Sequence, residues 1–167
     1  MTDIELIGCP DAEAALLGAA LLTGRADDVL TGVTLDDFTT GLHQAVFDAM
    51  RHLIDRGEPV DPVTVLGEMR AAGTVESRHG RDLGVSLVAL AEGCPTATNH
   101  RHYRRTVLEH SYRRRVRQAG ERLTQAAADT PLDELQQLTH REHIDVEQAR
   151  QRAGLTDAPT ATLKATA

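Results

Sequence analysis

The sequence has little of several residue types that whole classes of proteins require. Its 167 residues include one lysine, Lys164, no tryptophan, and only two phenylalanines and two tyrosines. A nucleotide-binding P-loop places a lysine inside a G-x-x-x-x-G-K-[ST] segment. Lys164 lies in no such segment, so ATP hydrolysis by this chain alone is excluded. With so few aromatic side chains, the core must consist mainly of Leu, Val, Ile and Ala, which suits closely packed helices.

Cysteine and long hydrophobic runs are also scarce. Cys9 and Cys94 form no C-x-x-C motif, and we interpret them as two free thiols in a reducing compartment. No apolar run approaches the roughly 18 residues that a membrane-spanning helix needs, and no secretory signal pattern is present. The sequence therefore predicts a cytoplasmic protein with no membrane partner. Its net charge of −7 argues against a protein whose entire surface binds nucleic acid.

The sequence does contain clear signals for helix starts and helix ends. Asp61 before Pro62 is a favourable N-cap followed by proline at the first helical position, and Gly24 and Gly57 follow amphipathic segments as expected stops. These signals and the apolar spacing predict a short helical turn at 26–30 and longer helices over about 11–23, 41–56, 62–73, 81–92, 98–128 and 131–150. Alternating β-branched runs are missing, so the predicted fold is all-α.

The predicted organisation is a globular bundle of about six helices followed by a C-terminal helical hairpin. The segments are a leader at 1–10, a helical body at 11–96, the long helix and hairpin at 97–150, and a disordered tail at 151–167. Residues 99–123 contain eight arginines and two glutamates, whereas residues 129–150 contain six acidic residues and two arginines. These opposite charges favour antiparallel pairing of the last two helices.

An apolar stripe follows the long helix and leaves two interpretations open. It could pack against the body, or it could be an exposed self-association surface on the hairpin. The stripe consists of Leu108, Tyr112, Val116, Ala119, Leu123 and Ala126. Our candidates for a contact between copies of the hairpin are Leu123, Leu132, Leu135 and Leu138.

The arginine-rich part of the long helix is a candidate nucleic-acid surface. Its candidate phosphate contacts are Arg113, Arg114, Arg115 and Arg117. At about 100° per residue, the arginines flank both sides of the apolar stripe and do not form one continuous basic face. This placement favours a structural or interfacial role over direct contact with DNA, which would be sensitive to salt.

The sequence predicts neither a cofactor nor a catalytic centre. His140, His143 and Glu147 share a helix face and are of ligand type for zinc. Only three such groups occur there, and no general-base motif such as H-E-x-x-H accompanies them, so an exposed helix face is the preferred interpretation. No G-x-S-x-G segment and no recognisable cysteine signature occur either.

An ordered series of short motifs resembles the N-terminal domain of DnaB-type replicative helicases. In chain order, the motifs are Glu13-x-x-Leu16-Leu17-Gly18-Ala19, Asp37-Phe38, His43-x-x-x-Phe47-x-Ala49, Gly57-x-Pro59-Val60-Asp61-x-Val63-Thr64, Ala71-x-Gly73, Leu87-x-x-Leu90-Ala91 and Pro95-x-Ala97-x-Asn99-x-x-x-Tyr103. No single motif is specific, but their order is, and the resemblance covers about residues 11–150.

The resemblance implies a helical body followed by a hairpin that pairs with a second copy. In that family three such dimers build the collar of a hexameric ring, and the collar is a docking platform for primase without catalytic residues. We therefore expect a non-catalytic module that self-associates and binds a replicative helicase or a DnaG-type primase. The alternatives are a subunit of a split helicase that acts with a separate ATPase chain, and a small DNA-binding regulator.

Overall fold

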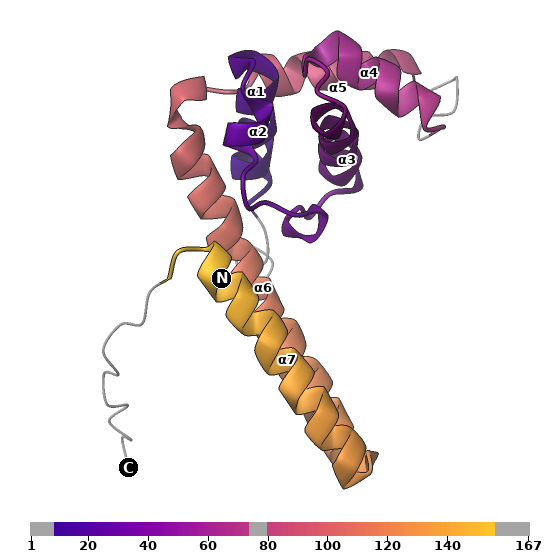
Figure 1. The fold of residues 1–167 in the computed structure, drawn as a ribbon, viewed down its shortest axis with the longest axis vertical. Helices are drawn as coiled ribbons and strands as arrows, with labels where there is room; N and C mark the ends of the chain where they lie inside the picture. Colours follow the sequence, from indigo (N-terminus) through magenta and orange to yellow (C-terminus); the bar gives the residue numbers. More distant parts are fainter. Residues whose placement is uncertain (1–8, 74–79, 156–167) are drawn as a thin grey trace. The chain divides into compact units, whose positions relative to one another are not determined.

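Helices account for all the regular structure in the described part of the chain. The computed structural model describes residues 9–73 and 80–155 and contains no strand there (Figure 1). In chain order, the elements are α1 (Pro10–Thr23), α2 (Ala26–Val29), the 3₁₀ helix η2 (Leu35–Asp37), α3 (Gly41–Asp55), α4 (Pro62–Ala71), α5 (Gly80–Glu92), the 3₁₀ helix η3 (Ala97–Asn99), α6 (His100–Asp129) and α7 (Leu132–Arg152). The predicted all-α fold is confirmed.

Several helix ends lie where the sequence signals predict them. The Asp61 carboxylate accepts hydrogen bonds from the backbone N–H groups of Val63 and Thr64, at 2.7 and 3.0 Å, and Pro62 is the first residue of α4. Gly24 ends α1 in the left-handed conformation with φ 62°, which glycine adopts without steric cost. These features are local, and for that reason the sequence alone could predict them.

Other local patterns have a different outcome in the structure. The chain around Thr34 has both hydrogen bonds of a capping box, which is typical of a helix start, but it opens only the three-residue η2. Pro131 stands at the N-cap of α7, which begins without a side-chain cap. Leu42 fits the apolar spacing of α3, but it is exposed in the structure.

Helix α1 lies at the centre of the first unit. It contacts α2, α3 and α5, and its residues from Ala15 to Leu21 are all buried. A helix that is apolar on every side is typical of such a core position. The crossing with α5 is especially close at Gly18, where an added Cβ would overlap the backbone carbonyl oxygen of Leu90 and lie 2.9 Å from Cys94 Cβ.

A buried polar cluster joins α1 to the start of α3. Glu13 is 2% exposed and His43 is 7% exposed, and His43 Nδ1 donates to a carboxylate oxygen of Glu13 at 2.8 Å. The backbone N–H and the hydroxyl of Thr39 donate to the same carboxylate, at 3.1 and 2.8 Å. Burial by itself raises the pKa of Glu13, but the hydrogen bonds from His43 and Thr39 outweigh it and hold that pKa below its ordinary value.

A second buried carboxylate, Asp37, joins η2 to Ser111, about three turns into α6. Asp37 accepts hydrogen bonds from the backbone N–H of Thr34, at 2.8 Å, and from the hydroxyl of Ser111. Asp37 and Ser111 are both buried. The buried charge therefore has donors from two elements, as a carboxylate removed from water requires.

The chain divides into two compact units, Met1–Ser111 and Tyr112–Ala167. The division falls inside α6, so the first turns of this helix belong to the body and the rest belongs to the hairpin. The predicted disordered tail falls mostly on residues 156–167, which lie outside the described residues, as does most of the predicted leader. Cys9 and Cys94 are free thiols, and no helix among the described residues is long and apolar enough to span a membrane.

Candidate functional site

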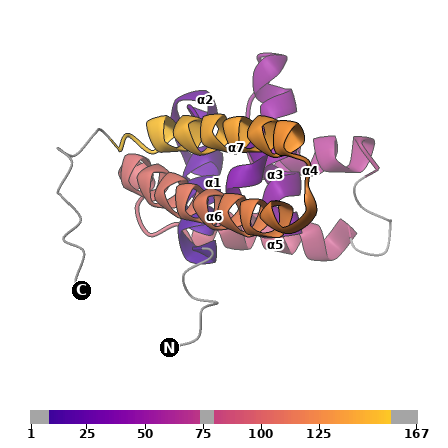
Figure 2. The same cartoon turned by 90° about the horizontal axis from the view of Figure 1, so that it is seen from below.

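The second unit is a helical hairpin formed by the C-terminal part of α6 and by α7. The two helices run side by side in both views of the ribbon (Figures 1 and 2). Among the described residues of this unit, 112–155, the buried ones are Ala119, Glu142, Ala149 and Ala153. Three of these four side chains are alanines, which let helices approach closely, and the fourth is an acid that needs a partner.

That partner is Arg122, which joins the two helices of the hairpin. Its guanidinium group donates to both carboxylate oxygens of Glu142, at 2.7 and 2.6 Å. These hydrogen bonds hold the pKa of Glu142 below its ordinary value, although burial of the carboxyl group acts in the opposite direction. A bidentate ion pair of this kind restricts the relative orientation of the two side chains and also stabilises the contact between the helices. The predicted charge pairing between the last two helices is thus present at this position, and it sets their register.

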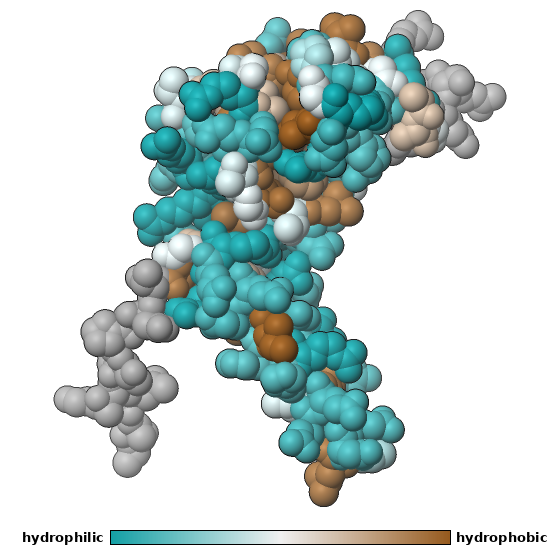
Figure 3. Space-filling model, viewed as in Figure 1, coloured by the Kyte–Doolittle hydropathy of each residue, from teal (hydrophilic) through white to brown (hydrophobic). Residues whose placement is uncertain are grey.

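The outer surface of α7 carries a shallow depression lined by one stripe of side chains. The lining residues are Leu132, Leu135, Gln136, Thr139, His140 and His143. Their spacing of three and four residues places them along one helix face. Leu132, at 84% exposure, is the most accessible large aliphatic side chain in the described part of the chain. On the face drawn in Figure 3, the hairpin is mostly hydrophilic with a few separate hydrophobic patches.

The four leucines that the sequence offered as interface candidates differ in accessibility. Leu132 is exposed, whereas Leu123, Leu135 and Leu138 are half-buried. Only Leu132 and Leu135 line the depression. The sequence analysis did not include Ile144, a large aliphatic residue on α7 that is 40% exposed. It stands alone between polar neighbours in the sequence, and that pattern could have identified it as a candidate for the surface of α7.

The candidate phosphate contacts on α6 are partly engaged within the chain. Arg113 is exposed, and Arg117 is exposed but paired with Glu121 at 2.9 Å. Arg114 and Arg115 are half-buried and have interactions of their own. These four arginines stay a predicted phosphate-binding set, in which Arg113 and Arg117 are the exposed members.

The structure also places the residues that were considered for zinc. His140 and His143 lie on the outer stripe of α7, while the Glu147 carboxylate accepts hydrogen bonds from Arg150 at 2.8 Å. Within the described ranges no group of three or more His, Cys, Asp or Glu side chains is arranged to hold a metal ion.

The sequence matches a known family over most of the first unit. The family model of the DnaB-like helicase N-terminal domain matches residues 9–109. The replicative DNA helicase DnaB of Geobacillus stearothermophilus is 40% identical over 107 residues, which are 64% of this chain and 23% of that protein. The replicative DNA helicase DnaC of Bacillus subtilis is 39% identical over 107 residues, with the same two shares. The chain thus spans about a quarter of the length of these relatives.

A solved structure matches a larger share of the chain. The crystal structure of the N-terminal domain of DnaB helicase from Mycobacterium tuberculosis superposes with a TM-score of 0.72 at 33% sequence identity. The alignment covers 83% of this chain and 98% of that one, so it reaches beyond the residues that the family model matches. From the ordered motifs, the all-α body with its hairpin and these matches, we conclude that the chain belongs to the family of DnaB-like helicase N-terminal domains.

Proposed function

We propose that this chain is a non-catalytic, collar-like module that associates with itself through the hairpin and binds a partner in DNA replication. The observation that carries the proposal is the outer stripe of α7, where Leu132 and Leu135 line a depression on a helix whose exposed residues are mostly polar. A single stripe on one helix can pair with the same stripe of a second copy in an antiparallel, two-fold arrangement. The Arg122–Glu142 pair supports this role because it holds the helix that presents the stripe.

The energetics favour the exposed end of the stripe as the main contact. Full burial of a leucine side chain contributes about 1.5 to 3 kcal/mol, and a two-fold contact buries each leucine twice. Leu132 is almost fully exposed in the single chain, so it has the most surface to remove from water. Half-buried Leu135 would extend the same contact along the helix.

The association is tested by light scattering over a concentration series with Leu132→Asp. We expect the wild type to form dimers or larger species, and the substitution to weaken dimerisation on the order of 100-fold or more. Leu22→Asp is the matched control, since Leu22 is an exposed leucine on α1. A wild type that stays monomeric at every concentration, or equal effects of the two substitutions, would show that α7 is not the interface.

The proposed partners are a replicative helicase and a DnaG-type primase in the cytoplasm. The chain's membership in a helicase N-terminal domain family supports this choice, because the relatives that it matches are replicative helicases. We expect saturable binding of the fluorescently labelled chain to at least one of the two purified partners, measured by anisotropy. Failure to bind either, together with steeply salt-dependent binding to duplex DNA, would instead favour a DNA-binding regulator.

A further inference from the structure

Two histidines of α7 lie in the depression that the proposed self-association uses. His140 and His143 are both exposed, and they line the depression together with Leu132 and Leu135. The described residues give neither imidazole ring a hydrogen-bond partner. The ring nitrogens of both histidines are therefore available to bind a metal ion, and imidazole nitrogen is a preferred ligand of zinc in proteins.

A single chain supplies half of a zinc site at this position. A spacing of three residues places the Cβ atoms of His140 and His143 about 5 to 6 Å apart on one helix face. The two rings can converge on one ion, because imidazole nitrogens bound to the same tetrahedral zinc are about 3.4 Å apart. Glu147, one turn after His143, is engaged elsewhere, since both its carboxylate oxygens accept hydrogen bonds from Arg150 at 2.8 Å. Among the described residues no group of three or more metal-binding side chains occurs, so two of the four ligands must come from elsewhere.

A two-fold contact between two copies of α7 supplies the other half. Helix α7 runs from Leu132 to Arg152, and its midpoint is at residue 142, halfway between these two ends. If two such helices pair in antiparallel orientation along their whole length, the two-fold axis passes at the level of this midpoint, between His140 and His143. The axis then places His140 of each copy beside His143 of the other. Four imidazole rings from two chains thus meet at the centre of the contact.

The charge of α7 favours a cation at that centre. The helix contains five acidic residues and three arginines, which gives a net charge of −2 with neutral histidines. Two copies of α7 side by side therefore repel one another electrostatically. A divalent cation bound between them offsets this repulsion.

We propose that His140 and His143 of two copies form a zinc site that bridges the α7 contact. This inference rests on the proposed self-association through α7 and adds a metal ion that strengthens it. Zinc binds the pair of chains in preference to the single chain, because the pair offers four ligands and the single chain offers two. A ligand that binds one state more tightly stabilises that state. Self-association of this chain therefore depends on zinc.

The test measures the dimerisation constant of the untagged chain by sedimentation velocity, once in EDTA and once in Zn²⁺. We expect zinc to strengthen dimerisation of the wild type on the order of 10-fold or more. Dialysed wild type should retain about one zinc ion per two chains, as a four-ligand site shared by two copies requires. In His140→Ala and in His143→Ala, the ratio of the two dimerisation constants should fall to about one, because two of the four ligands are lost.

Two variants with a possible zinc ligand outside α7 serve as matched controls. His102→Ala removes an exposed histidine of α6, and Cys9→Ser removes a half-buried thiol at the start of α1. Both variants should keep the wild-type ratio of the two dimerisation constants. If either control lowers this ratio as much as the two α7 variants do, zinc acts at another site and the proposal is overturned.

The same measurements separate the zinc site from the leucine contact. If zinc leaves the dimerisation constant of the wild type unchanged, or binds each chain singly, the zinc bridge is wrong. The α7 contact then still stands if Leu132→Asp weakens dimerisation in EDTA. If zinc promotes dimers that require His140 and His143 but are insensitive to Leu132→Asp, the zinc bridge stands and the leucine contact is wrong.

Discussion

Replacing Gly18 with alanine should destabilise the first unit, because among the glycines of the described chain an added Cβ meets its closest contact there. The added Cβ would overlap the carbonyl oxygen of Leu90 and lie 2.9 Å from Cys94 Cβ. The overlapped atom belongs to the backbone, so the strain can be relieved only if α1 and α5 move apart. Overpacking of this kind costs about 3 kcal/mol, and the melting temperature should fall by roughly 6 to 12 °C.

The matched control is the same substitution at Gly67. Gly67 lies inside α4, and an added Cβ there meets no atom within 4 Å. Gly67→Ala should stabilise the protein by about 0.5 to 1 kcal/mol, because alanine is the better helix former. Thermal unfolding followed by circular dichroism measures both variants. Equal melting temperatures for the two variants would show that α1 and α5 do not approach as closely as the structure indicates.

The second large effect is expected from Glu13→Gln. The Glu13 carboxylate accepts hydrogen bonds from His43 Nδ1, from the Thr39 backbone N–H and from the Thr39 hydroxyl. The amide of glutamine keeps the shape but turns an NH₂ group toward one of these donors and removes the charge. Loss of hydrogen bonds to a buried charged group should lower the free energy of unfolding by about 2 to 3 kcal/mol at neutral pH. Chemical denaturation measures this difference.

The effect of Glu13→Gln should depend on pH in a definite direction. The folded protein holds the pKa of Glu13 below the usual value of 4.5, so the ionised carboxylate contributes stability that is fully present above that value. This contribution is lost as the pH falls through the lower, folded-state pKa. The difference between wild type and variant should therefore shrink below pH 4.5. A difference that stays constant between about pH 7 and about pH 3 would contradict an ionised Glu13 in the folded protein.

An exposed glutamate provides the control for both measurements. Glu121 is 62% exposed and pairs with Arg117 one turn earlier in α6. Glu121→Gln should change the unfolding free energy by about 0.5 kcal/mol or less, because exposed ion pairs contribute little. A comparable loss in both variants would point to a general effect of removing charge and away from the Glu13–His43–Thr39 cluster.

The burial of Glu13 could not be predicted from the sequence. In the sequence, Glu13 lies near the start of a predicted helix, where a negative charge interacts favourably with the helix dipole and no further role is needed to explain it. The structure instead shows its carboxylate buried against His43, 30 positions further along the chain. Both residues belong to the motifs that identified the family, but no local pattern states that they meet. Their contact depends on how α1 packs against α3.

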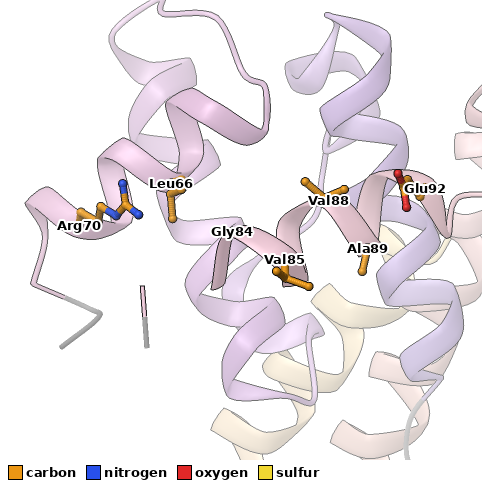
Figure 4. A pocket seen from close by; sticks show the side chains of 7 residues that line it. All are labelled: Leu66, Arg70, Gly84, Val85, Val88, Ala89 and Glu92. Atoms are coloured by element: carbon orange, nitrogen blue, oxygen red, sulfur yellow. The ribbon is translucent and has the colours of Figure 1, made fainter. Parts of the chain in front are cut away.

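The sequence also does not predict which apolar residues of α5 are exposed. The apolar spacing of Leu83, Leu87, Leu90 and Ala91 is that of one helix face, and all four are buried. Val85 and Val88 are of similar hydrophobicity, but they are 69% and 46% exposed and lie beside Gly84 in a hollow of the surface (Figure 4). Hydrophobicity alone does not distinguish these valines from the buried leucines.

The sequence by itself determined the helical class, several helix ends and the family, because caps, stops and apolar spacing act over a few neighbouring residues. Asp61 before Pro62 is one such signal, and the structure has the cap that it predicts. The tertiary structure alone decided that Gly18 is a point of helix contact, that Glu13 is buried, and which leucines of α7 line the outer stripe. Each of these depends on which distant segment packs against the residue, and that packing is determined by all the contacts of the core together.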